Sequence, residues 1–243
     1  MCLENFLQIL ECRLLASCIK VNVLLCCFSI DKRNDNSYYF DLKPSKPDIK
    51  TAFYTACIGG KICEDYEKKM ILNSNTDYYL FSDKEIYITG FKTILITKYM
   101  DNDPVRSARY IKINAHKYFK NYDNSIWMDC RLSPKILDSN VIINSHLSNN
   151  YNIAFFKHYC RNCIYEEANE IIKLKKDYQN IVNLQMEKYR NDNYPSNNGL
   201  FETTTLIRKH NNPKIIDLMM KWWEEVNNFS RRDQLSINYL VNK

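Results

Sequence analysis

The chain has 243 residues and a mass of 29.0 kDa, which suffices for one substantial hydrophobic core and favours a single domain with an extension. A hydrophobic share of 45% with only 4 glycines and 6 prolines argues against a disordered or fibrous chain. The net charge of +6 is modest and its Lys and Arg residues are spread along the sequence, so nucleic-acid binding is not expected.

The first apolar segment, residues 14–30, is interrupted by Lys20 and Asn22 and falls short of the roughly 20 apolar residues that cross a bilayer. Glu4 and Glu11 do not fit the basic start of a signal peptide. We therefore expect this segment to pack on the domain in a cytoplasmic protein. The alternative is a Golgi or other membrane-anchored protein, in which residues 14–30 are the anchor.

Residues 31–48 combine charges, Asn and two prolines without a sustained period, which predicts a linker. The sequence thus divides into an extension and linker, residues 1–48, and a catalytic domain, residues 49–243. A chain that begins near Pro47 is expected to stay folded.

Short runs rich in β-branched and aromatic residues follow the linker, with helical patterns between several of them. They are Thr51–Cys57, Tyr78–Phe81, Thr93–Thr97, Ser125–Met128, Ile153–Phe156 and Thr203–Ile207. Strands that alternate with helices predict an α/β domain with a largely parallel central sheet and flanking helices.

The first clear helix begins at Asp103 and Pro104, because Asp caps free N–H groups and Pro is tolerated in the first turn. It is expected to run to about Phe119. On its helical wheel Arg109, Lys112 and His116 lie within about 60° of one another, and Arg106 lies next to them. This basic stripe is either a solvated face or a surface that contacts the phosphates of a ligand.

Two more helix starts stand in the C-terminal part of the chain. Asn212 and Pro213 begin a helix with one apolar stripe, which predicts core packing: Ile215, Met219, Trp222 and Val226. Ser230 and Asp233 fit a capping arrangement for the last helix, although capping does not explain the Arg pair between them or Gln234.

Acidic residues directly after two predicted strands are the first candidates for chemistry, because open α/β sheets bind ligands at strand ends. Asp83 follows the strand through Phe81, and Asp129 follows the strand through Met128. One or two such carboxylates, together with phosphates, hold Mg²⁺ or Mn²⁺. A turn or helix cap is the alternative function of an Asp at a strand end.

Several well-known motifs are missing. The chain contains neither G-x-G-x-x-G nor G-x-x-x-x-G-K-[ST], which disfavours dinucleotide dehydrogenases and P-loop kinases. It also lacks G-x-S-x-G and H-E-x-x-H, the simplest hydrolase signatures. The 10 cysteines are scattered through apolar runs, so reduced buried thiols are expected, and Cys160 with Cys163 offers only one tight ligand pair for zinc.

Ordered blocks across residues 51–240 resemble the glycosyltransferase-like domain of plant mucilage-related probable hexosyltransferases, which also occurs in bacterial proteins. The blocks are Tyr54-Thr55-Ala56 with Gly59-Gly60, Asp77 to Asp83, Asp103 to Arg106 through Lys112 and His116, Ser125 to Asp129, Arg161 to Ala168, Gly199 to Glu202, and Trp222-Trp223-Glu224 with Arg232 to Ser236. The resemblance implies a Rossmann-like GT-A fold that binds a nucleotide-sugar across the first half of the sheet.

By this resemblance Asp129 lies at the metal-binding strand end and holds a divalent cation, Mn²⁺ or Mg²⁺, although Cys130 and Arg131 follow it where many such enzymes have a second aspartate. Asp129, Asp233 and Glu202 are the implied catalytic residues, the last two beside the acceptor. The implied substrate-binding residues are Asp83, Arg106, Lys112, His116, Arg161, Glu166, Arg232 and Gln234.

The implied activity is transfer of a hexose from a nucleotide-sugar donor to a hydroxyl of an unidentified glycan, lipid or protein. Stabilisation of the departing nucleoside diphosphate is then the dominant catalytic requirement. Two alternatives remain: a ceramidase-like lipid amide hydrolase, and a non-catalytic module that binds a glycan or nucleotide.

Overall fold

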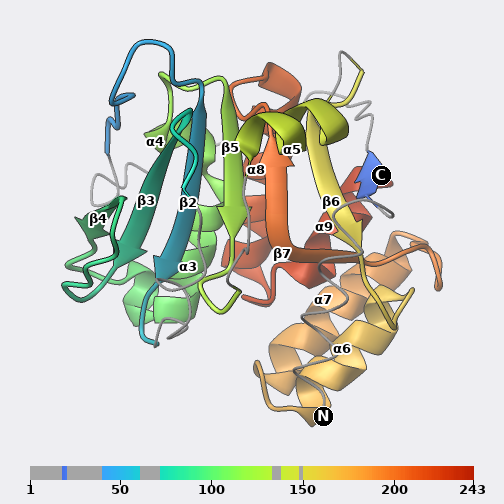
Figure 1. The fold of residues 1–243 in the computed structure, drawn as a ribbon. Helices are drawn as coiled ribbons and strands as arrows, with labels where there is room; N and C mark the ends of the chain where they lie inside the picture. The colour runs from blue at the N-terminus through green and yellow to red at the C-terminus, as the bar shows by residue number, and fades with distance from the viewer. Residues whose placement is uncertain (1–17, 21–39, 61–71, 133–137, 148–149) are drawn as a thin grey trace.

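The computed structural model describes residues 18–20, 40–60, 72–132, 138–147 and 150–243. They form an α/β fold around one seven-stranded sheet in the order β1-β6-β7-β5-β2-β3-β4 (Figure 1). The strands are β1 (Cys18–Lys20), β2 (Thr51–Cys57), β3 (Thr76–Ser82), β4 (Phe91–Leu95), β5 (Asn124–Met128), β6 (Ile153–Lys157) and β7 (Phe201–Arg208).

The central part of the sheet is parallel. Strands β5, β2, β3 and β4 pair in parallel, whereas β7 is antiparallel to both β5 and β6. It follows that β6 runs in the same direction as β5, while β7 and the short β1, which is antiparallel to β6, run the opposite way. The predicted α/β class with a mostly parallel central sheet and flanking helices is confirmed.

Helices cover both faces of the sheet (Figure 1). The α-helices are α3 (Pro104–Ile113), α4 (Ala115–Tyr118), α5 (Ser139–His146), α6 (Ile164–Lys173), α7 (Gln179–Asn191), α8 (Pro213–Asn228) and α9 (Gln234–Val241), with a short 3-10 helix η2 (Met100–Asn102) before α3. Helix α5 packs on one face of the sheet, and α3, α4 and α8 pack on the other. Helices α6 and α7 form a hairpin that packs against α9.

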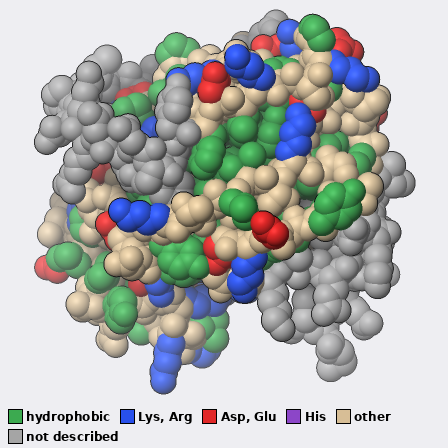
Figure 2. Space-filling model, turned by 90° about the vertical axis from the view of Figure 1, so that its left-hand side faces the viewer, with side chains coloured by type: hydrophobic (Ala, Val, Ile, Leu, Met, Phe, Trp, Pro, Cys, Tyr) green, Lys and Arg blue, Asp and Glu red, His purple; other side chains and the backbone are tan. Residues whose placement is uncertain are grey.

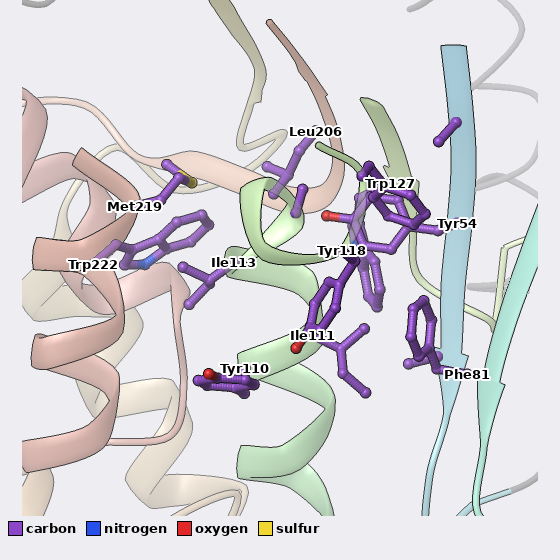
Figure 3. Close-up of a cluster of buried hydrophobic side chains, with 14 of the residues drawn as sticks. Tyr54, Phe81, Tyr110, Ile111, Ile113, Tyr118, Trp127, Leu206, Met219 and Trp222 are labelled. Atoms are coloured by element: carbon purple, nitrogen blue, oxygen red, sulfur yellow. The ribbon is translucent and has the colours of Figure 1, made fainter. Parts of the chain in front are cut away.

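The larger core lies between the sheet and α8, with α3 in the middle (Figure 3). Tyr54 and Trp127 from the sheet meet the α3 side of this layer, and Trp222 from α8 closes it from the other side; all three are at most 1% exposed. Ile111 and Ile113, also fully buried on α3, fill the space between them. Alternate apolar positions of a half-buried helix thus face two different neighbours.

The helix predicted for residues 104–119 is interrupted at Asn114, which separates α3 from α4. The cause is tertiary. The buried guanidinium of Arg208, on β7, donates hydrogen bonds to the carbonyl oxygens of Lys112 and Ile113, at 2.8 and 3.2 Å. Those carbonyls therefore have partners at the end of α3, where a cation is also favoured by the helix dipole.

Residues 40–48, the described part of the predicted linker, pack on the sheet. The ring of Phe40 lies 6.0 Å from that of Phe81, and the backbone N–H of Leu42 donates to the carbonyl of Tyr118. Ser45 donates from its backbone N–H and its hydroxyl to the carboxylate of Asp77, at 2.7 and 2.5 Å. That a chain beginning near Pro47 stays folded is still a prediction, but these contacts indicate that it would lose stability.

We therefore expect a protein lacking residues 1–46 to be less stable than one lacking residues 1–39 by about 2–4 kcal/mol, because it loses two partly buried apolar side chains and two hydrogen bonds to Asp77. Urea unfolding of the two truncated proteins measures the difference, and the shorter deletion is the control for loss of β1. Equal midpoints would show that residues 40–46 contribute nothing.

Within the described residues, no helix combines the length and the apolar character needed to cross a bilayer. Figure 2 shows one face of the molecule, on which apolar side chains gather in a central hollow and acidic and basic side chains are interspersed around it. The positive net charge is thus not concentrated on this face.

Candidate active site

The carboxyl ends of β2, β3 and β5 meet at one edge of the sheet, the lower edge in Figure 1. Asp83 follows β3 at this edge and accepts hydrogen bonds from the backbone N–H of Gly59 at 2.9 Å and the hydroxyl of Tyr99 at 2.5 Å. Gly59 has a φ of +65°, and a Cβ there would lie 2.6 Å from Pro104. Only glycine allows this close turn after β2.

Asp129 follows β5 at the same edge, with its side chain 24% exposed. Its Oδ1 accepts a hydrogen bond of 2.8 Å from the indole N–H of Trp127 and lies 3.8 Å from both Arg109 Nη1 and Lys112 Nζ. In none of these contacts does the Asp129 side chain accept a hydrogen bond from a backbone N–H, as it would in a turn or a helix cap. The strand end thus carries a partly exposed carboxylate beside two cations from α3.

Asp233 lies in the same cluster although it is far away in the sequence. Its carboxylate, 3% exposed, is 2.9 Å from Arg109 Nε and 2.5 Å from Lys112 Nζ, whose side chain is fully buried. Burial alone would raise the pKa of Asp233, but Arg109 and Lys112 hold it well below its usual range. Burial lowers the pKa of Lys112, and the two aspartates oppose that effect.

The capping arrangement predicted for the last helix is not what the structure shows. Asp233 precedes α9 without a side-chain capping bond. Ser230 instead accepts from the backbone N–H of Arg232 at 3.1 Å and donates to Asp177 at 2.7 Å. The Asp233 side chain is therefore not used as a cap and instead pairs with Arg109 and Lys112.

Arg232 and Gln234 flank Asp233, and each has a buried side-chain nitrogen without a hydrogen-bond partner among the described residues. Burial lowers the pKa of Arg232, the nearby Arg109 lowers it further, and Asp233, Glu167 and Asp129 act in the opposite direction. Arg232 therefore belongs to the neighbourhood of the cluster, and Gln234 follows Asp233 directly in the sequence.

Arg161 joins this neighbourhood through Glu167, a residue that was not predicted to be part of the site. Its Nε lies 2.6 Å from Glu167 Oε2, and its Nη2 lies 3.3 Å from His158 Nε2. Glu167 is buried, whereas the predicted Glu166 is exposed on α6. The position of Glu167 on the inner face of the helix, together with Ala168 and Ile171, is the helical period that could have distinguished the two.

Glu202 lies on β7 beside the end of β5. The backbone N–H of Asp129 donates to the carbonyl of Thr204 at 2.8 Å, and the Thr204 hydroxyl donates to Glu202 Oε1 at 2.9 Å. Glu202 stands near the start of β7, and because β7 is antiparallel to β5, this start lies at the edge that carries Asp129. The register of β7 against β6 shifts nearby, since Ala154 pairs with Ile207 but Phe156 pairs with Glu202.

Arg106 is turned away from this cluster. Its guanidinium donates to the carbonyl oxygens of Val226 and Asn227 at the end of α8, the latter at 2.6 Å. It therefore serves as a C-terminal cap of α8. The predicted contact between Arg106 and a phosphate is untested, and the hydrogen bonds of Arg106 to α8 disfavour it.

His116 also lies outside the cluster. Burial lowers its pKa to about 3, with Lys117 and Arg208 adding to the effect, and burial likewise lowers the pKa of His210 to about 4. His210 Nε2 is 2.7 Å from the carbonyl oxygen of Phe119. The basic stripe thus separates into Arg109 and Lys112 in the cluster, Arg106 bonded to the end of α8, and a His116 that is neutral at pH 7.

These two histidines predict that the stability of the folded protein decreases as the pH is lowered. Each stays neutral in the folded protein but gains a proton when unfolded below about pH 6.5, so protons favour unfolding. Between pH 7 and pH 5 we expect a loss of about 2 kcal/mol from each. Urea unfolding at both pH values measures it, and His116→Gln should remove about half of the difference. A difference that the substitution leaves unchanged would contradict this assignment.

The predicted divalent cation has few protein ligands at this edge. In the described part of the chain no three His, Cys, Asp or Glu side chains are grouped to hold a metal ion. Asp233 is engaged by Arg109 and Lys112, and Asp129 is flanked by the same two cations. Of these two carboxylates, only that of Asp129 is partly exposed. The positive charges of Arg109 and Lys112 beside it oppose the binding of a metal ion there.

Comparisons with known proteins agree with the sequence resemblance. A "Probable hexosyltransferase MUCI70" of Arabidopsis thaliana is 25% identical over 214 residues, which cover 84% of this chain but only 35% of that protein. The solved structure of the mannosyltransferase Ktr4p from S. cerevisiae aligns with 91% of this chain and 69% of its own, at 14% identity and a TM-score of 0.38. The family model described as "TOD1/MUCI70, glycosyltransferase-like domain" matches residues 55–243, and the chain belongs to this family.

Proposed function

We propose that the chain is a glycosyltransferase that moves a hexose from a nucleotide-sugar donor to a hydroxyl of a glycan, lipid or protein acceptor. The observation that carries this proposal is the convergence of Asp129, Asp233, Arg109 and Lys112 at the carboxyl edge of the sheet. That edge is where open α/β folds bind ligands, and the chain belongs to a glycosyltransferase-like family.

In this proposal the acceptor oxygen forms a bond to the anomeric carbon while the bond from that carbon to the phosphate oxygen breaks. The leaving nucleoside diphosphate takes the electron pair, so positive charge at the cluster stabilises it. Asp129, the partly exposed carboxylate at the end of β5, faces the positive charge that develops on the sugar ring. Asp83, on the neighbouring strand end, is our candidate for a contact with the nucleotide.

Glu202 is a better candidate than Asp233 for taking the proton of the acceptor hydroxyl. Asp233 is buried and its low pKa makes it a weak base, since a general base works best with a pKa near the operating pH. Glu202 is partly exposed on β7. We therefore assign Asp233 to holding Arg109 and Lys112 in place, and we expect Glu202→Gln to lower the rate of transfer more than it lowers donor binding.

Incubating the full chain with a panel of uridine and guanosine diphosphate sugars, with Mn²⁺ and with EDTA, tests the proposal. Release of nucleoside diphosphate or transfer of the sugar supports it. Cleavage of a ceramide amide instead would support a lipid hydrolase, and glycan or nucleotide binding without turnover would support a non-catalytic module. Either of the last two results overturns the proposal.

A further inference from the structure

The charges of the cluster do not cancel. Arg109 and Lys112 lie within 4 Å of Asp129 and Asp233, and Arg161 pairs with Glu167. Three cations therefore have three carboxylates as counter-charges, all at the same edge. Arg232 is a fourth cation in this neighbourhood and has no ion pair with a described residue.

The guanidinium of Arg232 lies near the charges of Asp233, Glu167 and Asp129 but forms no direct ion pair with a described residue. Its Nε is buried and has no hydrogen-bond partner among the described residues. Its backbone N–H is bonded to Ser230, which fixes the main chain at this position. A partly buried cation close to Arg109 is destabilised unless an anion completes the site, so the geometry indicates an anionic ligand.

Gln234 supplies one further donor close to Arg232 in the sequence. Gln234 places a buried Nε2 without a partner on the first turn of α9, two residues along the chain. An amide N–H and a guanidinium donate to phosphate oxygens, and neither accepts. A metal ion, in contrast, would be repelled by Arg232 and Arg109, and the described carboxylates nearest to them, Asp129 and Asp233, already lie beside Arg109 and Lys112.

We infer that this chain binds the diphosphate of its ligand directly through Arg232, without a divalent cation. This inference rests on the proposed function only for the identity of the ligand, since pyrophosphate carries the same chemistry. Arg232 replaces the charge that a metal ion supplies, and Asp129 and Asp233 orient the neighbouring cations instead of coordinating a metal.

Calorimetric titration of the full chain with inorganic pyrophosphate and with uridine diphosphate, in excess EDTA, tests the inference. We expect binding in EDTA, at least a tenfold loss of affinity in Arg232→Gln, and partial recovery in Arg232→Lys. The matched control is Arg190→Gln, which removes an exposed arginine that stacks on Tyr165, 4.9 Å from its ring centre, and should leave the affinity unchanged.

Thermal unfolding separates a binding role from a structural one. Because Arg232 forms no direct ion pair with a described residue, Arg232→Gln should raise the melting temperature of the ligand-free protein by a few degrees or leave it unchanged, and should abolish the further increase produced by pyrophosphate. Binding that requires Mn²⁺, or an affinity equal to wild type in Arg232→Gln, would overturn the inference. Metal-free binding without sugar transfer would retain it and reject the proposed function.

Discussion

Replacing Asp129 by Asn is expected to lower the rate of sugar transfer at least about 100-fold, the loss typical when one preorganised electrostatic group is removed from a site. Asn keeps the size of the side chain and an oxygen for the indole N–H of Trp127. It removes the negative charge beside Arg109 and Lys112, which in the proposed function faces the reacting sugar. Since Asp129 is partly exposed, stability should change by only about 1 kcal/mol.

Initial rates of nucleoside diphosphate release, with urea unfolding of the same samples, measure both effects. Asp123→Asn is the matched control, because Asp123 is exposed in the turn before β5 and should leave the rate unchanged. If Asp129→Asn stays within threefold of the wild-type rate, the catalytic assignment of Asp129 is wrong.

Replacing Asp233 by Asn is expected to have the largest effect on stability, about 3–5 kcal/mol, because it leaves two buried cations without their closest counter-charge. Lys112 is fully buried and lies 2.5 Å from Asp233, and Arg109 lies 2.9 Å away. The same burial means that Lys112→Ala cannot be a neutral test of phosphate binding. It would leave the Asp233 carboxylate with one partner fewer.

A double variant makes this prediction specific. Asp233→Asn with Lys112→Met removes both charges and should recover part of the loss, since replacing a buried ion pair with apolar groups is often close to neutral. Asp217→Asn is the control, because its pair with Lys221 is partly exposed and should contribute less than about 1 kcal/mol. A loss of the same size in Asp217→Asn and Asp233→Asn in urea unfolding would contradict the special role of the buried cluster.

The sequence predicts best those features that depend on local period. The expected strand Thr51–Cys57 is identical to β2, and Asn212 caps α8 through a hydrogen bond to the backbone N–H of Lys214. Strand ends also placed Asp83 and Asp129 at one edge, because parallel neighbours end together.

What the sequence could not predict was which partner each polar side chain meets. Arg106 and Arg109 are three residues apart on one helix, yet one caps α8 and the other faces Asp129 and Asp233. A helical wheel shows which residues share a face of the helix, but not which other elements pack against that face. The interruption at Asn114 could not be predicted for the same reason. It depends on a hydrogen bond to Ile113 from Arg208, which lies 95 residues later in the sequence.

The two arginine caps have a consequence for the order in which the site is made. Arg208 caps the end of α3, and Arg106, on α3, caps the end of α8. Each helix is thus completed by a residue from the other half of the chain. During synthesis, α3 with its Arg109 and Lys112 emerges from the ribosome long before β7, α8 and Asp233. The nascent chain therefore carries two cations whose burial awaits the synthesis of β7, α8 and Asp233, so this edge of the sheet is assembled only after residue 233 has emerged.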